Sequence, residues 1–196
     1  MTKIIHISEI YEHVNEIIKT FKNGGVVLYP TDTQYALGVL ARSETAIEKI
    51  SSIKEVSSQK AVSIVVSDIE MAAKYVYFND YTRGLMDKYL PGPLTLILPA
   101  KDIYLAKNIG NEDKIGIRIP DKSGILNIVK ELDCPITTTS ANISGQEPGD
   151  SCRQVLKDLQ GIDLAIDGGE LENEASTVIE CSDSGFEVIR QGVLVV

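Results

Sequence analysis

Apolar residues recur at helical spacing in some stretches of the chain and form short continuous runs in others, so helices and strands are expected to alternate. The first helical pattern covers residues 9–23. Ser8 stands where an N-cap residue is expected, and the Gly24-Gly25 pair should end the helix because glycine readily adopts the left-handed conformation found there. Five apolar residues fall on one face of this helix: Ile10, Val14, Ile17, Ile18 and Phe21.

The rest of the pattern predicts further elements along the whole chain. Helices are expected from Ser43 to about Lys54, after the capping box Ser67–Glu70, and over residues 79–90, 122–132 and 152–160. Strands are expected at 26–29, 61–66, 94–98, 115–119, 135–139, 163–166, 176–181 and 186–190. This order predicts an α/β fold whose sheet is of mixed direction. The length of 196 residues favours a single domain over residues 1–196.

Two segments rich in hydroxyl groups follow predicted strands. The apolar run 26–29 ends at Pro30, which cannot donate to a sheet ladder, and Thr31, Asp32 and Thr33 come next. The second segment is PITTTSANISG, residues 135–145. Because ligands bind beyond the carboxyl ends of strands in open α/β sheets, the two segments together suggest one polar cleft. The alternative interpretation is a pair of ordinary turns, in which such side chains bond to their own backbone.

Composition narrows the class of protein. The chain is 43% hydrophobic and 24% charged, and it has no apolar run of membrane-spanning length and no signal-peptide pattern, so a cytoplasmic location is expected. Cys134, Cys152 and Cys181 are far apart and predict reduced thiols, not disulfides or a zinc site. The formal net charge of −9 disfavours binding that depends on nucleic acid phosphates, so weak or no direct RNA binding is expected.

The chemistry of the chain does not follow a common nucleotide motif. The sequence has no GxxxxGK[ST] or GxGxxG segment, no HExxH motif and no paired carboxylates. Arg118 lies in the strand IGIRIP, and its side chain can face away from Ile117 and Ile119, toward a cleft. A guanidinium is suited to bidentate binding of a carboxylate or phosphate. The alternative interpretation of Arg118 is a surface charge on an edge strand.

Six segments together resemble the YrdC/YciO family of threonylcarbamoyl-adenylate synthases. They run in order from about residue 10 to 192: GGVVLYPTDTQYALG, LPGPLTLIL, IGIRIP, TTSANISG, STVIE and IRQG. The resemblance implies a twisted α/β sheet with the site on its concave face. It also implies a nucleotidyltransferase that makes threonylcarbamoyl-AMP and pyrophosphate from L-threonine, bicarbonate or CO2, and ATP with Mg²⁺. Other proteins would transfer the threonylcarbamoyl group to an adenosine next to the tRNA anticodon.

The resemblance also implies roles for individual residues. Thr33 would bind threonine and Arg118 would hold its carboxylate, with Ser176 and Thr138 nearby. Lys54, Ser140 and Asn142 would bind ATP and, with Arg118, form the catalytic group. Lys60, Lys114 and Arg190 lie at positions that approach the ATP. No metal ligand is expected from the protein itself.

One position departs from the family pattern. The family's Lys-x-Arg element reads Lys54-Glu55-Val56 here, and Ser57 follows where proline is usual. Losing a cation beside a triphosphate predicts slower synthesis, which Lys60 could partly offset. The alternative is a YciO-like protein with weak or no synthase activity that binds nucleotide or structured RNA. The sequence YALG resembles the YciO branch of the family, whereas SANISG resembles the YrdC branch. The extra C-terminal domain of larger family members is expected to be absent.

Overall fold

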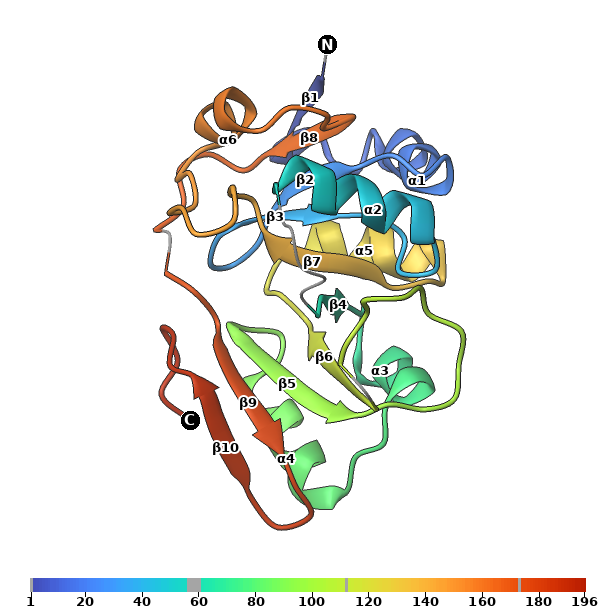
Figure 1. Ribbon diagram of the computed structural model, residues 1–196, viewed down its shortest axis with the longest axis vertical. Coiled ribbons are helices and arrows are strands. Elements are labelled where there is room, and N and C mark those ends of the chain that lie inside the picture. The colour runs from blue at the N-terminus through green and yellow to red at the C-terminus, as the bar shows by residue number, and fades with distance from the viewer. Residues whose placement is uncertain (1, 56–60, 112, 173) are drawn as a thin grey trace.

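The computed structural model describes residues 2–55, 61–111, 113–172 and 174–196. Its strands form one sheet in the order β1-β8-β2-β3-β7-β4-β6-β5-β9-β10, which runs from top to bottom of the molecule (Figure 1). The sheet contains parallel pairs such as β1–β8 and β5–β9 as well as antiparallel pairs such as β2–β3 and β5–β6. The expected α/β fold with a mixed sheet is therefore confirmed.

The elements have the following bounds. The strands are β1 Lys3–His6, β2 Val27–Pro30, β3 Tyr35–Gly38, β4 Ser63–Val65, β5 Leu94–Pro99, β6 Lys114–Arg118, β7 Ile136–Ser140, β8 Leu164–Asp167, β9 Thr177–Cys181 and β10 Phe186–Arg190. The helices are α1 Val14–Lys22, α2 Glu44–Ile53, α3 Ile69–Tyr75, α4 Asp80–Tyr89, α5 Ser123–Leu132 and α6 Cys152–Asp158.

Both faces of the upper part of the sheet are covered. On β2, Leu28 packs with the apolar residues of α2 and α6, whereas Val27 and Tyr29 pack with those of α1 and α5. Successive strand side chains point to opposite faces, so a strand covered on both faces needs apolar residues throughout. This requirement explains why β2 and β3 are buried at every position.

Only one face of the lower part is covered. Leu96, Ile117 and Ile179 belong to the core cluster that includes residues of α3 and α4. Figure 1 shows these two helices on one side of β5, β6 and β9, and no helix of the described residues on the other side. The alternate residues of these strands therefore form a face that is open to a ligand.

Several predicted boundaries need correction. The helix expected over residues 9–23 begins only at Val14; a 3-10 turn, Ile7–Glu9, precedes it, and Ser8 is not its cap. The α3 helix is capped by Asp68, whose side chain accepts from the Met71 backbone N–H at 2.7 Å. Strand β3 was not predicted, because its four residues follow directly on a turn that ends at Gln34.

Candidate functional site

Arg118 lies at the centre of the open face. On β6, Ile115 and Ile117 point into the core, so Lys114, Gly116 and Arg118 share the opposite face. The neighbours of β6 are β4 and β5, so the interpretation of Arg118 as a charge on an edge strand is wrong. Its side chain is only 8% exposed and lines a pocket of about 210 Å³. The expectation that Arg118 faces a cleft is confirmed.

Both hydroxyl-rich segments contribute to this region. Thr138 and Ser140 of β7 lie in the wall of the pocket, and Tyr35 follows the PTDT segment into the same wall. Within the PTDT segment, Thr31 donates to the Gln34 carbonyl at 2.7 Å and accepts from two backbone N–H groups. The segment is thus a self-bonded turn, as the alternative interpretation expected, and the residues that line the pocket are Gln34 and Tyr35 directly after it.

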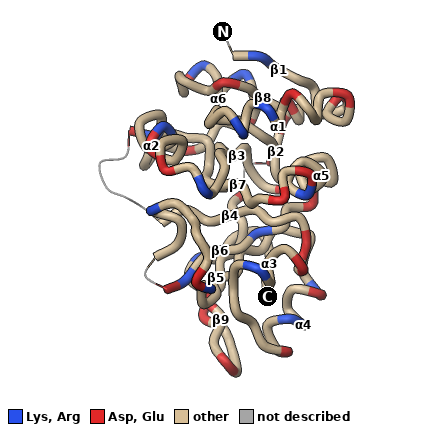
Figure 2. Tube along the Cα trace, turned by 90° about the vertical axis from the view of Figure 1, so that its right-hand side faces the viewer, with Lys and Arg blue, Asp and Glu red and all other residues tan. Residues whose placement is uncertain are grey.

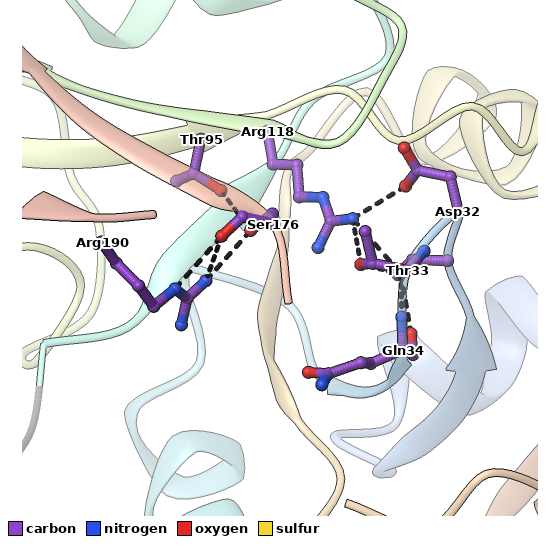
Figure 3. Close-up of polar contacts among 8 residues, drawn as sticks. Asp32, Thr33, Gln34, Thr95, Arg118, Ser176 and Arg190 are labelled. Atoms are coloured by element: carbon purple, nitrogen blue, oxygen red, sulfur yellow. Dashed lines mark hydrogen bonds and ion pairs between the residues drawn. The ribbon is translucent and has the colours of Figure 1, made fainter. Parts of the chain in front are cut away.

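One nitrogen of Arg118 is fixed by this turn. Its Nη2 donates to Asp32 Oδ1 at 2.7 Å, to Thr33 Oγ1 at 2.5 Å and to Thr31 Oγ1 at 3.3 Å. Figure 3 shows the second terminal nitrogen pointing away from Asp32. Thr33 is buried beside the guanidinium and is not part of the pocket wall. The turn therefore holds Arg118 in an orientation that leaves Nη1 directed elsewhere.

A second arginine is held in the same pocket wall. Arg190 donates through Nε and Nη2 to the Ser176 carbonyl at 3.1 and 2.9 Å, and through Nη2 to Ser176 Oγ at 3.1 Å. Burial, and then the nearby charge of Arg118, lower the pKa of Arg190 below its ordinary value. An arginine stays protonated despite such a shift. Two guanidinium cations that share one pocket favour an anionic ligand.

Three of the residues expected to bind ATP lie together. Lys54, 8% exposed, donates through Nζ to the carbonyls of Ser140 and Asn142 and to Asn142 Oδ1. Ser140 Oγ donates to Asn142 Oδ1 at 2.6 Å. These residues line a pocket of about 300 Å³ that shares Thr139, Ser140 and Arg190 with the first pocket. Lys54 therefore orders the turn after β7 at the junction of two pockets.

Lys114 is placed apart from these groups. Its Nζ forms an ion pair with Glu180 Oε1 at 2.6 Å. Both residues line a neighbouring depression of about 350 Å³. That depression shares Ser63 and Val178 with the first pocket. Lys114 thus borders an extension of the cleft and does not contribute to the wall around Arg118.

The remaining expectations concern the segment around Val56, the cysteines, metal ligands and membrane spans. Val56, Ser57 and Lys60 lie outside the described residues. The three cysteines are free and buried, as expected for reduced thiols. Within the described ranges, no three or more His, Cys, Asp or Glu side chains are grouped so that they could hold a metal ion. The helices of the described chain are all too short or too polar to cross a membrane.

Comparison with known proteins identifies the family. The Sua5/YciO/YrdC family model, which carries the description "Telomere recombination", matches residues 19–192. The chain belongs to this family. Over 98% of its length it is 39% identical to a Methanocaldococcus jannaschii protein named "Putative threonylcarbamoyl-AMP synthase", 94% of which is covered. It is also 29% identical to Escherichia coli YciO, with 92% of this chain and 89% of YciO covered.

Solved structures of the Sua5/YciO/YrdC family have the same fold. P. abyssi Sua5 superposes with a TM-score of 0.89 at 30% identity, over 98% of this chain and 57% of that chain. P. abyssi Sua5 complexed with L-threonine gives 0.86 at 27% identity, over the same shares of the two chains. E. coli YciO gives 0.84 at 26% identity, over 98% of this chain and 96% of that chain. The family resemblance and the fold that it implied are confirmed, and this chain spans little more than half of the Sua5 chain.

Sequence reasoning missed several polar residues at the site, among them Asp32 and Thr95. Asp32 was read only as part of a polar turn, and it pairs with Arg118. Thr95 was read only as part of the segment LPGPLTLIL and the strand 94–98, and it lies in the pocket wall beside Ser176. The signal for Thr95 was its place between Leu94 and Leu96 on a predicted strand, which puts its side chain on the face opposite to theirs. Its neighbour across the sheet depends on a register that the sequence does not reveal.

Proposed function

We propose that this protein is a threonylcarbamoyl-AMP synthase that joins L-threonine, bicarbonate or CO2, and ATP, with release of pyrophosphate. The observation that carries the proposal is the hydroxyl-lined pocket of a family member, with Arg118 and Arg190 in its wall. The 39% identity to a relative named for this activity supports it. Threonine as substrate is supported by the L-threonine complex of the structural neighbour Sua5.

Threonine is proposed to bind next to Arg118. The turn fixes Nη2, and Nη1 is directed away from Asp32 (Figure 3), so the guanidinium can pair with the substrate carboxylate. Ser176 and Thr138 supply hydroxyl groups from the same wall. Thr33 contributes by holding Arg118. The site can in this way orient the threonine amine toward bicarbonate or CO2.

ATP is proposed to occupy the adjoining pocket of Lys54, Ser140 and Asn142. Arg190 borders both pockets and can contact a phosphate group near the amino acid. Carbamate formation and attack on the α-phosphate both develop negative charge, which fixed cations and hydroxyl donors stabilise. Mg²⁺ commonly binds through substrate phosphates and water, and we propose that it arrives with ATP. Lys114, at the border of an extension of the cleft, is proposed to approach the ATP, and the family resemblance suggests the same role for Lys60.

A second candidate is a YciO-like protein with weak or no synthase activity that binds nucleotide or structured RNA. Val56, in place of the arginine that the family resemblance leads us to expect, favours it, as does the 29% identity to E. coli YciO. The net charge of −9 weighs against the RNA form of this candidate. Under the first proposal, the product would pass to other proteins that act on tRNA.

The test is an assay with ATP, Mg²⁺, L-threonine and labelled bicarbonate that measures pyrophosphate and threonylcarbamoyl-AMP. Both products are expected, and neither should form without threonine. Val56→Arg is expected to raise turnover or ATP affinity because it restores a cation beside the triphosphate, and Lys60→Ala to lower them. If wild type and Val56→Arg both yield no threonylcarbamoyl-AMP while ATP still binds, the second candidate replaces the first.

A further inference from the structure

Two buried hydroxyl groups in the pocket wall have hydrogen-bonding capacity that the protein leaves unused. Thr95 is 5% exposed and Ser176 is 4% exposed. Their oxygens lie 3.2 Å apart, and Arg190 donates to Ser176 Oγ (Figure 3). No further hydrogen bond of these two side-chain oxygens is found within the described residues. The other buried hydroxyls near Arg118, those of Thr31 and Thr33, already accept from its guanidinium.

Counting the hydroxyl protons of Thr95 and Ser176 shows which hydrogen bonds they can still form with a ligand. Each hydroxyl has one proton and two acceptor sites. The bond between Thr95 and Ser176 uses one of the two protons, whichever residue is the donor. Arg190 supplies its own proton and uses only an acceptor site of Ser176. One hydroxyl proton and further lone pairs therefore remain for a ligand, and a ligand hydroxyl can both accept and donate there.

The pair lies beside the group that is proposed to bind the substrate carboxylate. Thr95 is directly opposite Arg118 in the β5–β6 register. Directly opposite residues in an antiparallel pair have their Cβ atoms roughly 5 Å apart. Figure 3 shows Ser176 between the guanidinium groups of Arg118 and Arg190. In a β-hydroxy amino acid, only the α- and β-carbons separate the hydroxyl from the carboxylate, so one small ligand can span both groups.

Ser176 is also held rigidly by the end of the chain. Arg190 binds its carbonyl through two nitrogens, and the backbone N–H of Val193 donates to the Ala175 carbonyl at 3.1 Å. A Cβ added at Gly192 would collide with the backbone of Ala175 and Ser176, which shows how closely the two segments pack. A fixed pair of hydroxyl groups cannot move aside for a ligand that has no hydrogen-bonding group to match it. Such a site discriminates strongly against analogues that lack this group.

We propose that Thr95, together with Ser176, recognises the side-chain hydroxyl of the amino acid substrate and sets the preference for threonine over amino acids of the same shape without it. This inference rests on the proposed function. L-valine has a methyl group in place of the hydroxyl of threonine. If L-valine bound in the same way, the remaining hydroxyl proton and lone pairs of Thr95 and Ser176 would be buried without a hydrogen-bond partner, which is unfavourable.

The test is calorimetric titration of wild type, Thr95→Val and Thr95→Ser with L-threonine and with L-valine. Wild type should bind threonine at least about tenfold more tightly than valine, since an unsatisfied buried polar group costs about 1–3 kcal/mol. Thr95→Val should weaken threonine binding at least about tenfold and leave valine binding within about threefold of wild type. Thr95→Ser keeps the hydroxyl and should retain the preference. Thr82→Val, the same change at a buried threonine of α4 outside this pocket, should leave both affinities unchanged.

The outcomes separate this inference from the function on which it rests. Equal weakening of both ligands by Thr95→Val would mean a structural role and would overturn the inference, as would a wild type that does not prefer threonine. In both cases threonine still binds and the proposed function stands. A wild type that binds neither amino acid, alone or with ATP, would overturn the proposed function and the inference with it.

Discussion

The ion pair between Arg118 and Asp32 shows what could be predicted at the scale of single residues. Alternation along IGIRIP predicted that Arg118 faces a cleft, because the period of a strand is local. The partner of Arg118 could not be predicted, because Asp32 comes from a turn that lies 86 positions away in the chain. Asp32 Oδ2 and Arg118 Nε are buried without partners in the described structure, so the pair has capacity for a further contact.

Removing Arg118 is expected to affect both binding and stability. Arg118→Ala should weaken threonine binding at least about tenfold, because charge-assisted hydrogen bonds to a carboxylate contribute about 1.5–3 kcal/mol. It should also lower the free energy of unfolding by about 3 kcal/mol, because the carboxylate of Asp32, 12% exposed, loses its cation. Calorimetry with threonine and urea unfolding measure the two effects separately.

The double variant Asp32→Asn/Arg118→Met serves as the control. It removes both charges, so the unfolding free energy should recover toward wild type while threonine binding stays weak. Arg83→Met, which breaks an exposed pair with Asp87, should change neither quantity appreciably. Threonine affinity equal to wild type in the double variant would remove Arg118 from the proposed site.

At the scale of elements, most helices and strands were predictable, but the start of α1 and the short strand β3 were not. The helix α5, Ser123–Leu132, matches its predicted range within one residue because its apolar residues keep a clear helical spacing. The start of α1 was misplaced because the buried Ile10 fits a helical pattern although it lies in the 3-10 region before the helix. Strand β3 is four residues long and buried on both faces, so it shows no alternation.

The segment after β10 supports the site, and Gly192 tests this. Gly192→Ala places a Cβ against the backbone of Ala175 and Ser176, so the segment or Ser176 must move. Overpacking of this kind typically costs about 1–3 kcal/mol of stability, and threonine affinity should fall about tenfold because Ser176 shifts. Calorimetry and urea unfolding again provide the measurements.

Gly185→Ala is the matched control for this substitution. Gly185 lies in the β9–β10 turn, where an added Cβ would approach only Ser182 Oγ, at 4.0 Å. Its threonine affinity should equal that of wild type. If Gly192→Ala loses stability but keeps full affinity, the C-terminal segment supports the fold without positioning Ser176.

At the scale of the whole molecule, the class of fold could be predicted but the order of the strands could not. Alternating helices and strands imply a layered α/β arrangement whatever the pairing. The pairing itself depends on contacts between distant segments, such as β2 with β8. Figure 2 shows acidic and basic residues interspersed along the Cα trace, so the net charge alone also gave no indication of where the cations gather.

Several acidic groups are buried in neutral form, which predicts a decline in stability at high pH. Burial, and then the charge of Asp167, raise the pKa of Cys152 from 9.0 to about 11. Burial likewise raises the pKa of Tyr29 and of Tyr35. Above pH 9 the unfolded chain releases protons that the folded protein retains, so the free energy of unfolding falls as pH rises from about 9 to 11.

Urea unfolding at pH 7, 9 and 10.5 measures this decline. Cys152 alone contributes up to about 2–3 kcal/mol, because each unit of pKa shift corresponds to about 1.4 kcal/mol. Cys152→Ala should therefore show a shallower decline than wild type, whatever its stability at pH 7. Parallel curves for the two proteins would show that this thiol does not contribute to the pH dependence.

The position of β8 between β1 and β2 has a consequence for how the protein is made. Residues 3–6 and 27–30 leave the ribosome first, but the strand that joins them, residues 164–167, is synthesised much later. Until then the edges of β1 and β2 that β8 will cover lack their partner, and unpaired edges of this kind promote aggregation. Translation speed and chaperone supply over this interval should therefore govern the yield of soluble protein, even for variants whose folded state is fully stable.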